Sequence, residues 1–165
     1  MALDIGLDID EAAWPARPDW EAVVTAAAGA ALAQALGDDF ARRGLFAVDI
    51  VLADDETVAT LNGQYRRKPY PTNVLSFPSA PVTGLPDDEP RPLGDIVLAA
   101  GVVAREAKEG RKTLAAHVSH LVVHGMLHLL GYDHETDAET EELAALEVAA
   151  LKRLDIADPY ADHEG

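Results

Sequence analysis

Residues 112–134 read KTLAAHVSHLVVHGMLHLLGYDH, and this stretch decides both the predicted fold and the predicted site. Its run of Ala, Leu and Val predicts a long, largely buried helix over about 112–130. Gly131 falls where that helix must end, and glycine readily adopts the left-handed conformation that ends helices. The chain can then turn back and bring the next residues close to the last turns of the helix.

Three histidines in this stretch have the spacing of a metal site. His124 and His128 are four residues apart, so on a helix both imidazoles lie on one face and can reach one ion. After the turn at Gly131, His134 can reach the same ion. Three neutral imidazoles with one open position are typical of catalytic zinc sites. We therefore predict that His124, His128 and His134 bind one Zn²⁺ per chain for hydrolytic chemistry, although nickel or cobalt would also accept three imidazoles.

The neighbouring residues have other predicted roles. His117 and His120 lie one or two turns earlier on the same helix, and we interpret them as core histidines or as partners of the ligands. His163, near the end of the chain, is expected to be solvated. The spacing HxxxHxxGxxH is also that of metzincin proteases, which carry Glu directly after the first His as general base. This chain has Gly125 there, which argues against peptide hydrolysis.

The rest of the chain is interpreted as strands followed by helices. The predicted strands are 3–9, 46–52, 73–77 and 94–99. The predicted helices run from a cap at Asp19 to Leu36, from Asp54 or Asp55 to Leu61, from the last strand to Lys108, and from the capping box of Thr136 and Glu139 to near Leu154. Prolines at 78, 81, 86, 90 and 92 predict a surface loop over 78–92 that contains no strand or helix.

Length and composition favour a single domain. A chain of 165 residues with 48 % apolar and 25 % charged residues fits one soluble domain over 1–165, of class α/β (α+β). We expect a small mixed sheet with packed helices and the metal site on a central helix. No signal peptide or membrane span is expected, so the predicted location is cytoplasmic. The absence of cysteine excludes thiolate ligands and a cysteine nucleophile.

The charge balance is strongly acidic. The net charge is −16, from 29 acidic and 13 basic residues, which argues against a general nucleic-acid binder because affinity for phosphates rests on Lys and Arg. Basic residues nevertheless cluster at 42–43, 66–68 and 105–112, so the sequence allows a local basic cleft. An arginine fork in 66–68 can hold a phosphate at two points, but the segment taken alone is better interpreted as a basic surface loop.

Two separate segments resemble one known family. Residues 124–134, HGMLHLLGYDH, resemble the signature of the YbeY family of endoribonucleases. Tyr65-Arg66 followed by TNVLSF at 72–77 resembles the other characteristic segment of that family, and Gly94-Asp-Ile fits as well. The matches span roughly 61–147, about half of the chain, and the proline-rich 78–92 contributes nothing to them.

The resemblance implies a fold, a site and a function. It implies one α/β domain whose zinc is held by His124, His128 and His134, with Arg66 as the functionally important arginine that stabilises transition-state charge. It implies a single-strand-specific, metal-dependent endoribonuclease that acts in 16S rRNA 3′-end maturation and ribosome quality control. The implied partners are RNA and the ribosome or ribosomal proteins, with no DNA and no membrane.

Three other functions remain open at this point. The ligand spacing also fits a metalloprotease-like hydrolase. A non-catalytic, zinc-stabilised ribosome assembly factor would use the acidic surface to bind basic ribosomal proteins. The third alternative is a small-molecule metallohydrolase. Asp133 and Asp95 are further carboxylates in the matched region, and we assign neither of them a catalytic role.

Overall fold

The structure, a computed structural model, describes residues 3–40, 44–80, 84 and 89–160. In chain order the elements are β1 (Leu3–Ile9), α1 (Trp20–Leu36), β2 (Phe46–Ala53), α2 (Asp55–Arg66), β3 (Val74–Pro78), β4 (Arg91–Ala99), α3 (Ala100–Glu109), α4 (Leu114–Leu129) and α5 (Asp137–Lys152). They form a single small α+β domain, as predicted.

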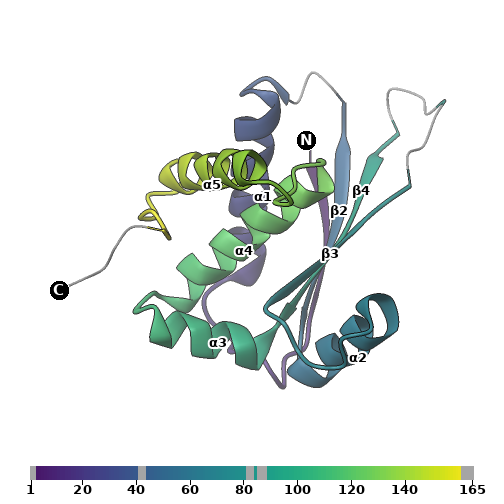
Figure 1. Ribbon diagram of the computed structural model, residues 1–165, viewed down its shortest axis with the longest axis vertical. Helices are drawn as coiled ribbons and strands as arrows, with labels where there is room; N and C mark the ends of the chain where they lie inside the picture. Colours follow the sequence, from purple (N-terminus) through teal and green to yellow (C-terminus); the bar gives the residue numbers. More distant parts are fainter. Residues whose placement is uncertain (1–2, 41–43, 81–83, 85–88, 161–165) are drawn as a thin grey trace.

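The four strands form one mixed sheet in the order β1-β2-β4-β3, which confirms the predicted sheet (Figure 1). β1, β2 and β4 are parallel to one another, and β3 runs antiparallel beside β4. Among the helices that the structure describes, none has the length and apolarity needed to cross a membrane.

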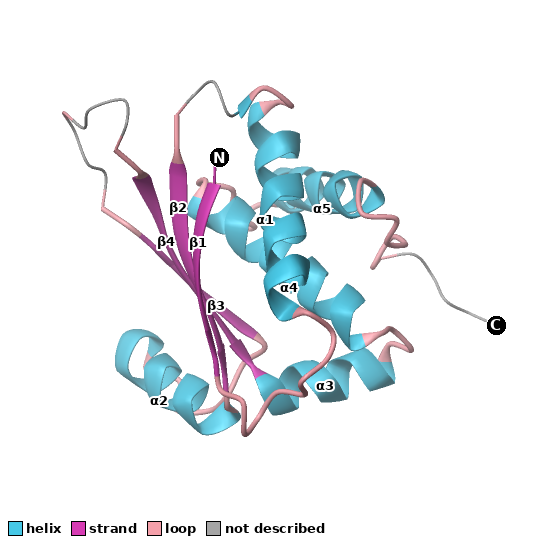
Figure 2. Ribbon diagram, turned by 180° about the vertical axis from the view of Figure 1, so that it is seen from behind, coloured by secondary structure: helices cyan, strands magenta, loops and turns pink. Residues whose placement is uncertain are grey.

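Helices cover the two faces of the sheet unequally. Figure 2 shows α1, α4 and α5 on one face and α2 on the other. The alternation of side chains along β4 explains this division, because successive residues of a strand point to opposite faces. Ile96 and Leu98 belong to the large core under α1, α4 and α5, whereas Val97 packs with Val58 of α2 in a smaller cluster. The long helix α4 therefore lies on the main core.

Several helix ends are formed by the residues predicted to form them. The Asp19 side chain accepts from the backbone N–H of Ala22 at 3.3 Å and begins α1, which Gly37 ends with φ 100°. The Thr136 hydroxyl accepts from the backbone N–H of Glu139 at 3.1 Å and begins α5. Capping of this kind satisfies N–H groups that have no partner within the helix.

Helix α2 is longer than predicted. It ends at Arg66 rather than Leu61, so Arg66 is helical instead of lying between a helix and a strand. Arg67 ends the helix in the left-handed conformation, with φ 58° and ψ 30°, and its N–H donates to the carbonyl of Asn62. A non-glycine residue in this conformation gives no strong sequence signal, which is why the prediction stopped too early.

The prediction that 78–92 contains no strand was wrong at both ends. Pro78 is the last residue of β3 and pairs with Gly94, and β4 begins before Pro92. Among the described strands, β2 is the one that pairs with β4 at Pro92, because the strand pairing with β3 ends at Gly94. A proline is tolerated in a strand where one edge has no partner.

Gly94 is expected to be essential for the fold. Its φ is 139°, and a Cβ atom there would lie 2.2 Å from the carbonyl oxygen of Phe77 and 2.9 Å from Cδ2 of Leu129. We expect Gly94→Ala to lower the free energy of unfolding by roughly 2–4 kcal/mol, because backbone strain and overpacking act together. Urea unfolding followed by tryptophan fluorescence measures this change.

Gly29→Ala is the matched control. Gly29 lies within α1, and a Cβ atom there would have no atom within 4 Å apart from its own helix backbone and chain neighbours. The substitution should stabilise the chain by up to about 1 kcal/mol through helix propensity. Equal unfolding midpoints for Gly94→Ala and the natural chain would contradict the assigned role of Gly94.

Candidate metal centre

The end of α4 and the following turn bring the three predicted ligands together. Gly131 has φ 102°, as predicted for the residue that ends this helix. Its N–H donates to the carbonyl of His128 at 3.0 Å, and the N–H of Tyr132 donates to the carbonyl of Leu127 at 3.0 Å. These bonds reverse the chain and place His134 beside the last turn of α4.

The three histidines converge as a metal site requires. One ring nitrogen each of His124, His128 and His134 lies within 4.8 Å of the others. The ring centroids are separated by 4.6 Å for His124 and His128, 5.3 Å for His128 and His134, and 6.2 Å for His124 and His134. Zinc–nitrogen bonds of about 2.0–2.1 Å place ligand nitrogens roughly 3.3 Å apart in a tetrahedral site, so only small adjustments are needed.

The exposure of these side chains leaves one side of the site open. His124 and His128 are half-buried and His134 is exposed. Burial lowers the pKa of His128, and the neighbouring His124 and His134 lower it further. A neutral imidazole is the form that ligates metals, so the surroundings of His128 favour a ligand. The three residues therefore fit a metal ion that a substrate could reach.

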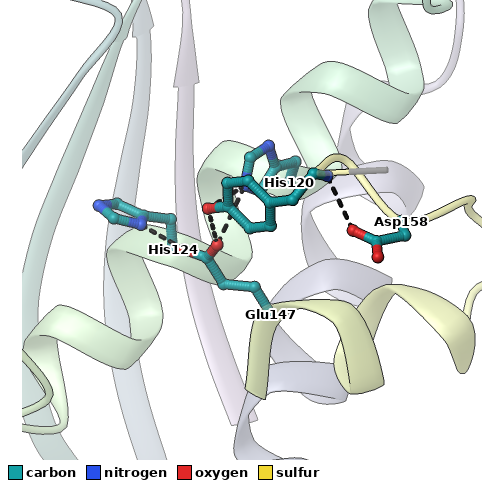
Figure 3. A network of polar contacts seen from close by, with 5 residues as sticks. His120, His124, Glu147 and Asp158 are labelled. Carbon is teal, nitrogen blue, oxygen red and sulfur yellow. Dashed lines mark hydrogen bonds and ion pairs between the residues drawn. The ribbon is translucent and has the colours of Figure 1, made fainter. Parts of the chain in front are cut away.

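Sequence reasoning missed a fourth member of the site, Glu147 of α5. Its side chain is 0 % exposed, and Figure 3 shows it between histidines of α4 and the C-terminal segment. One carboxylate oxygen accepts from Nδ1 of His124. The other accepts from Nε2 of His120 at 3.2 Å and from the hydroxyl of Tyr160. The network ties α4, α5 and the C-terminal segment together beside the ligand candidate His124.

The hydrogen bonds keep this buried carboxylate ionised. Burial alone raises the pKa of Glu147, but the bonds from His120, His124 and Tyr160 outweigh burial and hold that pKa at about 2. Burial and the nearby Glu147 raise the pKa of Tyr160, which therefore stays a neutral donor. The sequence carried one signal for this role: Glu147 falls on the apolar stripe of α5, between Leu143 and Leu151.

The other two histidines of α4, His117 and His120, lie outside the group of three ligand candidates and contact glutamates. His117 is buried, and its Nε2 lies 2.9 Å from Oε1 of Glu106 on α3. His120 contacts Glu147 rather than the three ligand candidates themselves. His163 lies outside the described residues.

Gly125 packs against the sheet. A Cβ atom at this position would lie 3.0 Å from Cδ1 of Ile96 and 3.1 Å from Oγ of Ser76. A glutamate here would have to displace core side chains of β3 and β4. The general base of the metzincin proteases therefore has no room at this position.

The structure does not bring Arg66 into contact with the histidines. Arg66 is exposed at the end of α2, and α2 covers the face of the sheet opposite to α4 (Figure 2). Within the described parts of the chain, no hydrogen bond or ion pair joins Arg66 to His124, His128 or His134. Its catalytic role stays a prediction.

Asp133 and Asp95, the two further carboxylates of the matched region, make other contacts. Asp133 accepts from the backbone N–H of His134 at 2.8 Å and so helps to shape the turn. Asp95 pairs in register with Asp49 and shares the α2 face of the sheet with Val97. Burial and the charge of Asp49 raise the pKa of Asp95. Neither observation gives these carboxylates a catalytic function.

Comparisons with known proteins identify the family of the chain. The sequence profile described as Endoribonuclease YbeY matches residues 17–155. A protein of Nitrobacter winogradskyi named Endoribonuclease YbeY is 49 % identical over 153 residues, which cover 92 % of this chain and 78 % of that protein. A protein of the same name from Bradyrhizobium diazoefficiens is 47 % identical over 154 residues, 92 % of this chain and 82 % of the relative.

The fold also has a solved counterpart. A Thermotoga maritima protein studied in solution aligns with a TM-score of 0.54 and 21 % identity over 99 % of this chain and 98 % of that protein. At this identity the likeness concerns the fold alone. The profile match and the two relatives cover nearly all of the chain, including the histidine signature, and they confirm the family predicted from its motifs. The chain belongs to the YbeY family.

Proposed function

We propose that this chain is a single-strand-specific endoribonuclease with one zinc ion held by His124, His128 and His134. We further propose that it acts in 16S rRNA 3′-end maturation and ribosome quality control. Membership of a family described as Endoribonuclease YbeY supports the reaction class. The observation that carries the site assignment is the convergence of three ring nitrogens within 4.8 Å at an open position.

The chemistry follows from the ligand set. A divalent ion held by these three histidines would supply Lewis-acid chemistry for hydrolysis of a phosphodiester near neutral pH. His124 and His128 are held by α4, and Glu147 accepts from Nδ1 of His124, which leaves Nε2 of that ring available to an ion. The exposed His134 lies on the side from which a phosphodiester can approach.

Arg66 is the residue that we propose to contact the phosphate of the substrate. It is exposed, and no hydrogen bond or ion pair within the described ranges occupies its guanidinium. Its neighbours in sequence, Arg67 and Lys68, add positive charge to the same segment. A planar guanidinium can bind two phosphate oxygens at once, so it can stabilise charge that develops during cleavage.

The packing of Gly125 weighs against the metalloprotease alternative, because the glutamate base of that mechanism cannot be accommodated there. A non-catalytic assembly factor is the principal rival, and the His128→Ala experiment separates it from the enzyme. RNA and the ribosome or ribosomal proteins are the proposed partners, and the proposed location is the cytoplasm.

His128→Ala tests the metal site. We expect zinc affinity to fall by more than about 100-fold, since loss of a ligand costs more than the 10–100-fold typical of outer partners. Cleavage of single-stranded RNA should fall to background with it. Zinc content is measured by mass spectrometry, folding by circular dichroism, and cleavage on synthetic RNA and on ribosomal subunits that carry an unprocessed 16S 3′ end.

His117→Gln is the matched control, because it removes a histidine from the same helix and its amide can still donate to Glu106. It should keep both zinc and cleavage. Failure of the zinc-loaded natural chain to cleave any of these RNAs, together with unfolding of His128→Ala, would favour the assembly factor.

Arg66→Ala tests the phosphate contact. It should lower kcat for RNA cleavage about 100-fold, the usual cost of one transition-state charge contact, and leave zinc content unchanged. Arg66→Lys should recover only part of the rate, because an ammonium group lacks the planar fork. Arg105→Ala removes the same charge from an exposed site on α3 and is the control. Loss of zinc from Arg66→Ala, or equal losses of rate in both alanine variants, would contradict the assignment.

A further inference from the structure

Glu147 is a charged group in an apolar setting, and its presence there needs a reason. It is 0 % exposed and lies on the buried stripe of α5 with Leu143, Ala150 and Leu151. An unpaired carboxylate in such a place is strongly unfavourable, and an apolar side chain of similar volume would often be more stable. Packing alone does not account for a glutamate at this position.

The hydrogen bonds of Glu147 explain what it does to His124. An ionised carboxylate only accepts, so the ring nitrogen Nδ1 of His124 must carry the proton. A neutral imidazole has one N–H group, and the lone pair is then on Nε2. The contact therefore selects the tautomer in which Nε2 of His124 can bind a metal, and it also fixes the ring plane.

The second oxygen of Glu147 is held from two directions. His120 Nε2 lies 3.2 Å from it, and the Tyr160 hydroxyl donates to it. The Tyr160 ring packs edge-on against the His120 ring, with 5.6 Å between the ring centroids. The backbone N–H of Tyr160 donates to the side chain of Asp158 at 2.8 Å. As Figure 3 shows, the C-terminal segment thus reaches back to a group in direct contact with a ligand candidate.

We propose that Glu147 is a positioning residue that fixes His124 for metal binding, and that Tyr160 and His120 hold Glu147 in place. This inference rests on the proposed function, since it concerns the same metal site. It adds that residues after α5 take part in the metal centre, although Tyr160 itself is 55 % exposed and lies 26 residues after His134.

The same helix supplies an internal comparison. His117 also contacts a glutamate, Glu106 of α3, at 2.9 Å, and Glu106 accepts from the side chain of Asn73 at 3.1 Å. His117 is not among the three histidines that converge. His117, His120 and His124 of α4 therefore each contact a glutamate of another helix, and of these contacts the one between His124 and Glu147 includes a ligand candidate.

The experiment measures zinc affinity of the full chain by competition with a chromophoric chelator at fixed pH. Glu147→Gln should weaken zinc binding roughly 10–100-fold, the range found for outer partners of metal ligands. Tyr160→Phe should weaken it roughly 3–10-fold, the factor that one hydrogen bond of ordinary strength contributes. Glu106→Gln should leave zinc affinity unchanged.

A second measurement separates positioning from general stability. In the metal-free chain, the ¹⁵N spectrum of the histidine rings should show His124 protonated at Nδ1, and Glu147→Gln should shift it towards a mixture of tautomers. A purely structural role would lower the unfolding midpoints of Glu147→Gln and Glu106→Gln alike without changing that spectrum. Should Glu147→Gln not fold, Tyr160→Phe still tests the proposal because it removes one hydroxyl from a partly exposed side chain.

The outcomes distinguish this inference from the function on which it rests. Suppose that the natural chain binds zinc and cleaves RNA, and that Glu147→Gln and Tyr160→Phe bind zinc with unchanged affinity. The positioning role is then overturned, and the enzymatic function stands. Equal weakening by Glu106→Gln also overturns the positioning role. Natural chain that binds no zinc overturns both.

Discussion

The close contact between α4 and the sheet at Gly125 sets the orientation of the site. A Cβ atom there would approach Ile96 and Ser76 to about 3 Å, so only glycine lets the helix lie this near to the strands. Successive residues of an α-helix are rotated by about 100° around its axis. Measured from Gly125, which faces the sheet, His124 lies about 100° around the axis and His128 about 60° around it in the same direction. His120 falls on that side as well. The contact of Gly125 with the sheet therefore turns these histidines to the side of α4 on which α5 packs.

Helix α5 meets this side of α4 with a stripe that is apolar apart from Glu147. The same face that buries Leu143 and Leu151 also carries the carboxylate that contacts His124. Core packing and the contact with His124 therefore depend on one helix–helix interface. A buried charge of this kind is tolerated only with its donors in place, which links the position of the C-terminal segment to the integrity of the site.

Local sequence signals were sufficient for much of this architecture. Asp19, Thr136 and Gly131 act within a few residues of themselves, and the three ligand candidates are close in sequence, so spacing alone placed them. Glu147 could not be found in this way, because its partner lies 23 residues earlier on another helix. Which face of α5 meets α4 is a tertiary fact that periodicity does not contain. The position of Pro92 in a strand likewise depends on the pairing of β4 with β2, which the local sequence does not reveal.

The acidity of the chain is compatible with the proposed RNA substrate when the position of each charge is considered. At physiological ionic strength the Debye length is about 8 Å, so exposed acids such as Asp4 and Asp8 on β1 act only over short distances. Glu147 is closer to the site, but it lies behind His124 and has no exposed surface. A dication held by three neutral imidazoles would present positive charge on the open side. The local field that a phosphodiester meets would then combine the charge of the bound ion with that of the nearest acids, such as Asp133 beside His134, and would not follow the net charge of −16.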